Sequence, residues 1–149
     1  MTVSSTRLAG LLAAAALVVS IAAAAEQAPQ PAASTSAWSG VFNQDQVERG
    51  RTAYNAQCAR CHGETLGGGE NSPTLVDDGF FKVWDGRTVG DLVEYTRTMM
   101  PSDGPGKISR KRCIDMAAFL LSENGFPAGA GELPAELDAL NQIAITRTK

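Results

Sequence analysis

The sequence predicts an all-α fold with three main helices joined by short turns. Three segments carry apolar residues at spacings of three and four, and a residue that often caps helices precedes each of them. Between these segments the chain is rich in Gly, Pro, Asn and Asp, which favour loops. At 149 residues, with its first residues set aside, the chain is long enough for one modest domain.

The first main helix is predicted to begin after Asn43 and to run to about Gln57, with Val47 and Tyr54 on one face. An irregular loop should follow over 63–79, because this stretch is dense in Gly and contains Asn-Ser-Pro and Asp-Asp-Gly. The first helix therefore leads directly into the short segment that contains two Cys residues.

The second main helix is predicted for 89–98, with Thr88 as its cap and a short helical turn over 80–84 before it. Its apolar side is formed by Val89, Leu92, Val93 and Thr96. Residues 101–106 contain two Pro and two Gly, so they should interrupt the helical structure.

The third main helix is predicted to begin after Ser109 and to end before Gly125, a residue suited to a left-handed cap. One side of it carries Ile114, Ala117, Ala118 and Leu121. Pro134 is the predicted start of a short additional helix that reaches about Ile143.

The segment Cys58-Ala59-Arg60-Cys61-His62 follows the first helix directly. Two Cys separated by two residues and followed at once by His have the spacing of a c-type haem attachment site. The thiols of Cys58 and Cys61 would form thioethers with the haem vinyl groups, and His62 would bind the iron. The motif therefore predicts one covalently attached haem c.

Two other interpretations of this motif fit the sequence less well. A structural zinc site needs four Cys or His ligands, which would take all three Cys and the one His of the sequence, and there is no second Cys-x-x-Cys pair. A thioredoxin-like redox pair follows a strand, and no run of alternating β-branched residues precedes Cys58. Haem attachment is the leading interpretation.

The N-terminal residues have the composition of a secretory signal peptide. Arg7 precedes an apolar stretch over 8–25, and Ala23-x-Ala25 is a suitable cleavage site. A retained membrane anchor is the alternative, but no stop-transfer pattern follows. We therefore predict a signal peptide, export to the periplasm, and a mature protein that is not integral to the membrane.

The sequence divides into four predicted parts. After the signal peptide at 1–25, residues 26–37 form a flexible tether rich in Ala, Pro and Ser, 38–126 form the haem domain, and 127–149 form a C-terminal extension. Loss of Arg7 with the signal leaves 12 of the 13 basic residues against 16 acidic ones, a net charge near −4. This charge makes nucleic acid an unsuitable partner.

A second iron ligand is expected on the other side of the haem if the protein transfers electrons. A soft, neutral thioether suits this position because it favours ferrous iron and raises the reduction potential. Met100 is the best candidate, since it follows a helix and begins a loop rich in Pro and Gly. Met99 is its competitor, and Met116 lies in a helical apolar pattern that indicates a core residue.

These marks together resemble the class I c-type cytochromes, which are small monohaem electron carriers. The resemblance covers about 40–125 and rests on Cys58-x-x-Cys61-His62-Gly63, on Met100-Pro101, and on the order of helix, motif, loop, helix, Met and helix. It implies a cytochrome c fold around one covalent haem, and it favours Met100 over Met99.

The resemblance also implies contacts around the haem. The first and last helices should cross, with Gly50 allowing close approach and Tyr54 packing on Phe119 or Leu120. The carbonyl of Pro73 should accept a hydrogen bond from the second ring nitrogen of His62. Trp84 and Arg87 are candidates to serve the haem propionates, although core packing for Trp84 and a solvated surface charge for Arg87 remain alternatives.

The function predicted from the resemblance is one-electron transfer by a haem iron that cycles between Fe(III) and Fe(II), without enzymatic activity of its own. Its partners would be a redox protein donor and acceptor, met either as a free monomer or within a complex. The first alternative is the cytochrome subunit of a periplasmic dehydrogenase complex, either quinoprotein or sulfur-compound oxidising. The second is a haem protein with an open iron site and a catalytic or ligand-binding role, against which Met100-Pro101 and the lack of a second His argue.

Lys107, Arg110, Lys111 and Arg112 form the main basic cluster of this otherwise acidic chain. A solvated helix face is the plain interpretation of these residues. The functional hypothesis is that the cluster docks an acidic redox partner, which would make association weaken with salt.

Overall fold

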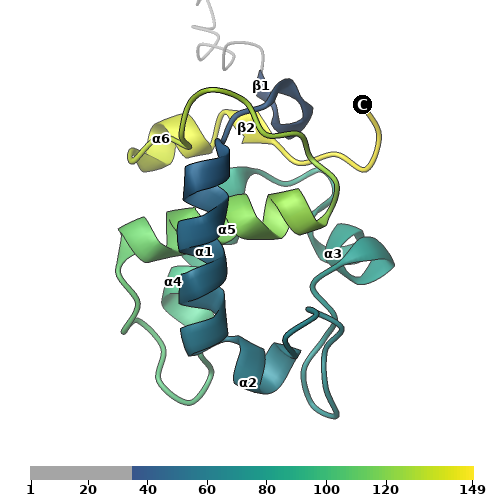
Figure 1. Ribbon diagram of the computed structural model, residues 1–149, viewed down its shortest axis with the longest axis vertical. Helices are drawn as coiled ribbons and strands as arrows, with labels where there is room; N and C mark the ends of the chain where they lie inside the picture. Colours follow the sequence, from purple (N-terminus) through teal and green to yellow (C-terminus); the bar gives the residue numbers. More distant parts are fainter. Residues whose placement is uncertain (1–34) are drawn as a thin grey trace, which may run out of the picture. The chain divides into compact units, whose positions relative to one another are not determined.

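The computed structural model describes residues 35–149, and the predicted signal peptide and most of the predicted tether lie outside these residues. The described part is mostly helical, as predicted, and it also contains one small sheet that was not predicted (Figure 1). Its elements in chain order are β1 (Thr35–Ser36), a short 3-10 helix (Ala37–Ser39), α1 (Gln44–Gln57), α2 (Ala59–His62), α3 (Asp77–Trp84), α4 (Val89–Met99), α5 (Arg110–Glu123), α6 (Leu137–Leu140) and β2 (Ile143–Ala144).

The three main helices begin where their caps predict. The side chain of Asn43 accepts a hydrogen bond from the backbone N–H of Gln46, at 2.9 Å, at the start of α1. Thr88 and Asp91 form a complete capping box at the start of α4. Ser109 caps α5 through its hydroxyl, and Gly125 follows this helix with a φ of 85°.

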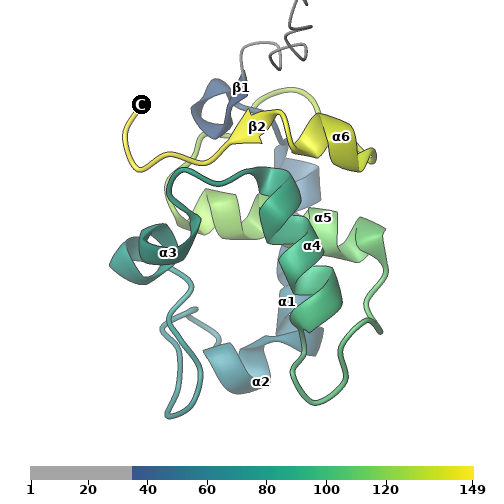
Figure 2. The same ribbon diagram turned by 180° about the vertical axis from the view of Figure 1, so that it is seen from behind.

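Helices α1 and α5 cross in close contact and form the centre of the fold (Figures 1 and 2). Gly50 makes this crossing possible, because a Cβ atom at this position would lie 1.9 Å from the carbonyl oxygen of Asp115. One turn further along α1, the ring of Tyr54 packs on that of Phe119 with centroids 5.3 Å apart. The predicted crossing and both of its contacts are therefore present.

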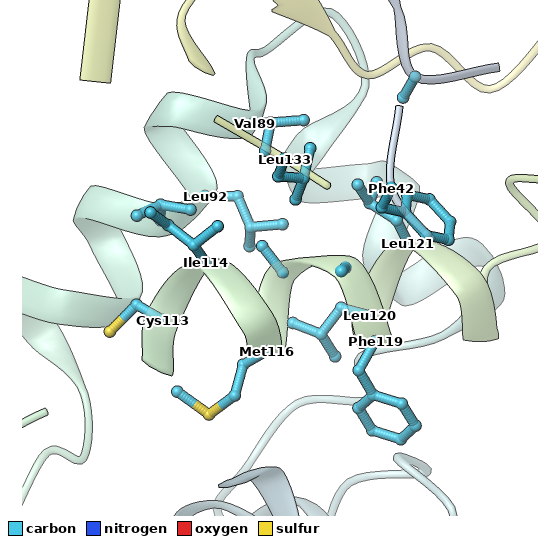
Figure 3. Packing of buried hydrophobic residues seen from close by; sticks show 14 of the residues in the cluster. Phe42, Val89, Leu92, Cys113, Ile114, Met116, Phe119, Leu120, Leu121 and Leu133 are labelled. Carbon is cyan, nitrogen blue, oxygen red and sulfur yellow. The ribbon is translucent and has the colours of Figure 1, made fainter. Parts of the chain in front are cut away.

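The core extends from this crossing toward α4 and the C-terminal segment. Helix α5 presents a nearly continuous buried surface from Cys113 to Leu121. Figure 3 shows these side chains meeting residues from three other parts of the chain, including Phe42, Leu92 and Leu133. A helix buried on so many sides can serve as the internal support of the domain.

Two predicted boundaries were wrong. Helix α3 begins at Asp77 rather than Phe80, so the loop ends earlier than its Gly content suggests. The predicted helix from Pro134 to Ile143 shrinks to α6, because Ile143 enters strand β2. In both places a long-range contact overrides the local preference of the sequence.

The C-terminal segment packs into the same unit as the haem domain. Strand β2 pairs in parallel with β1, with Thr35 opposite Ile143. The indole N–H of Trp38 donates to the carbonyl of Thr146 at 2.8 Å, and Leu140 and Ile145 are fully buried. The region described as an extension, together with residues from Thr35 onward, is thus part of one hydrophobic core.

Within residues 35–149, no helix combines the length and the apolar character that crossing a bilayer requires.

We predict that Gly50→Ala will lower the free energy of unfolding of the haem-loaded protein by about 3 kcal/mol, because the new methyl group collides with the α5 backbone. Urea unfolding followed by circular dichroism measures this change. Gly131→Ala is the matched control, since a Cβ there has no atom within 4 Å and its effect should stay within about 0.5 kcal/mol. Equal losses for both variants would contradict the close crossing.

Candidate haem-binding site

A cavity of about 650 Å³ lies among helices α1 to α5. Each of these helices contributes to its wall. Figures 1 and 2 show how the five helices are arranged. The wall is largely apolar and includes Leu75, Phe80, Leu92 and Leu120. A volume of this size with a few convergent polar groups is typical of a cofactor site.

The Cys-x-x-Cys-His segment forms one side of this cavity. The N–H of Cys58 donates to the carbonyl of Tyr54 at 2.7 Å, so the motif continues from the last turn of α1 into α2. Cys58, Cys61 and His62 all line the cavity. Helix α1 thus fixes the position from which both thiols and the imidazole reach into the cavity.

The two thiols differ in their surroundings. Cys61 is exposed, whereas Cys58 is half-buried with its sulfur 3.7 Å from that of Met116. Burial raises the pKa of the Cys58 thiol to about 11, and the neighbouring Cys113 and Cys61 contribute less. Cys58 is therefore a neutral thiol at ordinary pH, packed where the cavity wall meets α5.

The ring of His62 is held by the loop that follows it. Its Nδ1 atom lies 2.9 Å from the carbonyl oxygen of Pro73, which is the contact that the resemblance implies. When Nδ1 carries the proton it donates to this carbonyl, and the lone pair of Nε2 is then available to a metal. This loop therefore selects the tautomer that an iron ligand requires.

The same loop packs tightly against the motif. The N–H of Gly68 donates to the carbonyl of His62 at 2.9 Å, and a Cβ at Gly69 would lie 2.9 Å from the carbonyl oxygen of Cys61. The hydroxyl of Tyr54 donates to the carbonyl of Gly63 at 2.7 Å. Burial raises the pKa of Tyr54 to about 12, which keeps this donor protonated.

Met100 contributes to the cavity from the end of α4, and Met99 does not. Met99 is the last residue of α4 and is 52% exposed, whereas Met100 is the C-cap residue and lines the cavity. Met116 is 1% exposed in the core, as its sequence pattern indicates, and it also reaches the cavity wall. The structure thus brings Met100, but not Met99, to the same cavity as His62.

Trp84 and Arg87, the two candidates to serve the haem propionates, also differ in whether they line the cavity. Trp84 is 5% exposed, lines the cavity and meets Tyr95 edge to face with centroids 5.6 Å apart. The guanidinium of Arg87 lies 5.7 Å from the centre of the Trp84 ring and is not part of the cavity wall. Arg87 therefore covers the outer side of Trp84.

The sequence did not predict the ion pair between Arg60 and Asp103. It joins α2 to the loop that begins at Met100, and both of its members line the cavity. The hydrogen bond from Arg60 holds the pKa of Asp103 below its usual range. Neither residue follows a recognisable motif, so only the folded chain reveals this pair.

The cavity fits a covalent haem. It combines two thiols at the required spacing, an imidazole with its second nitrogen hydrogen-bonded, a thioether and an apolar wall. Thiols supply the attachment, nitrogen and thioether sulfur are suitable axial ligands, and apolar walls suit the porphyrin faces.

Comparison with known proteins agrees with this chemistry. A family model described as cytochrome c oxidase, cbb3-type, subunit III, matches residues 45–120, just over half of the chain. The fold, the donors and this match define the class as the class I c-type cytochromes, which carry electrons on a covalent haem c. The chain belongs to the family described as cytochrome c oxidase, cbb3-type, subunit III.

Among solved structures, the chain is similar to one from the sulfane dehydrogenase SoxCD of Paracoccus pantotrophus, with 21% identity and a TM-score of 0.48. The match covers 72% of this chain and 61% of that chain, so this chain spans about three fifths of the length of the structure it matches. No curated protein matches the sequence.

We predict that the denatured haem-loaded protein will take up one iodoacetamide group, on Cys113, because haem attachment consumes the thiols of Cys58 and Cys61. Mass spectrometry of the intact chain and of its peptides measures the number and the place of the adducts. The same chain expressed without haem-attachment machinery is the control and should take up three. Two or three adducts on the haem-loaded chain would contradict the thioether assignment.

Proposed function

We propose that this protein is a periplasmic one-electron carrier in which Cys58 and Cys61 attach the haem and His62 and Met100 bind its iron. The observation that carries this proposal is that one cavity collects these four side chains and leaves Met99 outside. Haem c, when bound, supplies a reversible one-electron change between Fe(III) and Fe(II). The protein has no enzymatic activity of its own in this proposal.

The role of His62 follows from its hydrogen bond. Donation from Nδ1 to the Pro73 carbonyl fixes the ring orientation and makes the imidazole a stronger electron donor through Nε2. Stronger donation stabilises the ferric state. The loop that carries Pro73 therefore lowers the reduction potential relative to a histidine without this partner.

Met100 and the cavity wall act in the opposite direction. A thioether is a soft, neutral ligand that favours ferrous iron. The apolar side chains of Leu75, Phe80, Leu92 and Leu120 lower the local dielectric constant, which penalises the additional charge of the ferric state. These contributions raise the potential, so the chain balances them against the donation of His62.

In an electron carrier, unlike a haem enzyme, no coordination position of the iron is open to a substrate. His62 and Met100 would hold the iron of a bound haem from the same cavity, and in that arrangement they would leave no position for a substrate. His62 is also the one histidine of the sequence, so no second imidazole is available for acid and base work on peroxide. These features support electron transfer over the open-site alternative.

The predicted signal peptide supports a periplasmic location. Arg7, the apolar stretch over 8–25 and Ala23-x-Ala25 have the pattern of a cleaved signal. Haem attachment through Cys-x-x-Cys-His agrees with such a signal, because the thiols are joined to haem on the export side of the membrane.

The basic surface next to the cavity is suited to binding an acidic redox partner. A second hollow between α1 and α5 is lined by Arg49, Lys111 and Arg112 and shares Gln57 with the haem cavity. Within this hollow Asp115 pairs with Arg49 and with Lys111, whereas Arg112 takes part in no ion pair within residues 35–149. The position of Arg112 next to the cavity suits the attraction of negative charge toward the haem.

We predict that ferric wild-type protein will show the weak far-red band of sulfur bound to ferric iron, and that Met100→Ala will lose this band. Met99→Ala is the matched control and should keep it, because Met99 lies outside the cavity. Absorption spectra with and without added cyanide measure both ligation and access. A wild-type protein that lacks the band and binds cyanide readily would replace the carrier with the open-site alternative.

We predict that oxidation of the ferrous protein by hexacyanoferrate(III) will slow as ionic strength rises, because the basic residues near the cavity attract this anion. The net negative charge of the whole chain would produce the opposite salt dependence. Stopped-flow kinetics across a salt series measures the rate constant.

Arg112→Glu should weaken or reverse this salt dependence. Lys149→Glu makes the same change of charge at the C-terminus and should alter the slope less. Identical slopes for the two variants would show that net charge, rather than the basic side of the cavity, controls the encounter.

A further inference from the structure

Asn124 is a buried polar residue at the C-terminal end of α5 that does not line the haem cavity. Its amide makes three hydrogen bonds to the backbone. Its Nδ2 donates to the carbonyls of Leu120, at 2.8 Å, and Leu75, at 3.0 Å, and its Oδ1 accepts from the N–H of Asp77 at 2.9 Å. One side chain thus holds both sides of the segment 75–77 against α5.

This segment continues from the residue that contacts His62. Pro73 lies two positions before Leu75, and its carbonyl is 2.9 Å from Nδ1 of His62. The N–H of Leu75 donates to the carbonyl of Leu66 at 2.8 Å, while the carbonyl of Leu75 accepts from Asn124. The chain just after Pro73 is therefore hydrogen-bonded to both Leu66 and Asn124.

Two residues that take part in these hydrogen bonds, Leu66 and Asp77, have strained backbone conformations. Within residues 35–149, Leu66 and Asp77 are the non-glycine residues with positive φ, at 59° and 53°. Such backbone conformations are unfavourable for residues other than glycine and persist where the surrounding structure fixes them. The bond from the Asp77 N–H to Asn124 is one of the contacts that fix the second of them.

We propose that Asn124 is a positioning residue for the haem iron. By holding 75–77 on α5, it keeps the Pro73 carbonyl on the imidazole of His62 and so sets the electron donation of this ligand. The inference rests on the proposed role of His62 and extends it to a residue outside the site. Without Asn124, the Pro73 carbonyl moves away, the imidazole donates less, and the equilibrium shifts toward ferrous iron.

The experiment compares Asn124→Leu with Gln46→Leu in the haem-loaded full chain. Gln46 is the matched control: it is a buried amide, 2% exposed, that accepts a backbone hydrogen bond from Leu133 at 2.9 Å and lies outside the cavity wall. Both substitutions remove a buried amide from the core, so both should lower the melting temperature. Only Asn124→Leu should alter the iron.

Two measurements separate positioning from plain stability. In equilibrium with a mediator dye, Asn124→Leu should raise the ratio of ferrous to ferric protein by roughly threefold or more, equivalent to about 28 mV at 59 mV per tenfold for one electron. In proton NMR of the ferrous protein, the ring N–H of His62 should exchange at least tenfold faster. Gln46→Leu should leave both readouts unchanged.

An unchanged or lowered potential in Asn124→Leu, with His62 exchange as slow as in wild type, would overturn the proposal and leave Asn124 a purely structural residue. This failure differs from a failure of the proposed function, because the far-red band of the wild-type protein reports His62 and Met100 ligation independently.

Wild-type hydrogen exchange tests the proposal if Asn124→Leu does not retain haem. The amides of Leu75 and Asp77 and the ring N–H of His62 should open together, with protection factors within threefold of one another. A tenfold difference between the Asp77 amide and the His62 ring N–H would overturn the proposal.

Discussion

The crossing of α1 and α5 is the constraint on which the rest of the structure depends. Gly50 lets the two backbones meet, and Tyr54 and Phe119 complete the contact one turn later. This crossing fixes the last turn of α1, and the carbonyl of Tyr54 in that turn receives the N–H of Cys58. The direction in which the haem motif enters its cavity is therefore decided by a helix contact outside the motif.

Helix α5 connects this contact to the chemistry of the site in two further ways. Met116 and Leu120 form part of the cavity wall, and Asn124, one turn beyond Leu120, binds the segment that leads from Pro73 into α3. The proximal loop and the cavity wall therefore share one rigid support. A displacement of α5 would change burial and histidine hydrogen bonding together, and these two contributions act on the reduction potential with opposite signs.

Local patterns were sufficient for the parts of the structure that local physics controls. Caps and periodicity predicted the three main helices, and the spacing of the thiols and the histidine predicted the haem. The choice between Met99 and Met100 depends on where α4 ends, and a spacing of one residue could not decide it before the family resemblance was considered. The burial of the C-terminal segment depends on β1, more than 100 residues earlier in the chain, with which it pairs. The hydrogen bonds of Asn124 to residues 75–77 also join distant parts of the sequence, so no sequence pattern predicted them.

The size of the cavity links the cofactor to the stability of the fold. Protein interiors are packed about as densely as organic crystals, so apolar walls around about 650 Å³ are stable only when something apolar fills the space. Helix α3 is joined to the rest of the described chain by the hydrogen bonds of Asn124 and Arg147 and by the ring contacts of Phe81 with Phe126 and of Trp84 with Tyr95. Contacts made by the haem then belong to the hydrophobic core as much as to the redox site. Folding and haem attachment should consequently be coupled, as they are in small metal-binding domains whose ligand set forms only on folding. Covalent attachment at Cys58 and Cys61, as proposed, would make this part of the core permanent.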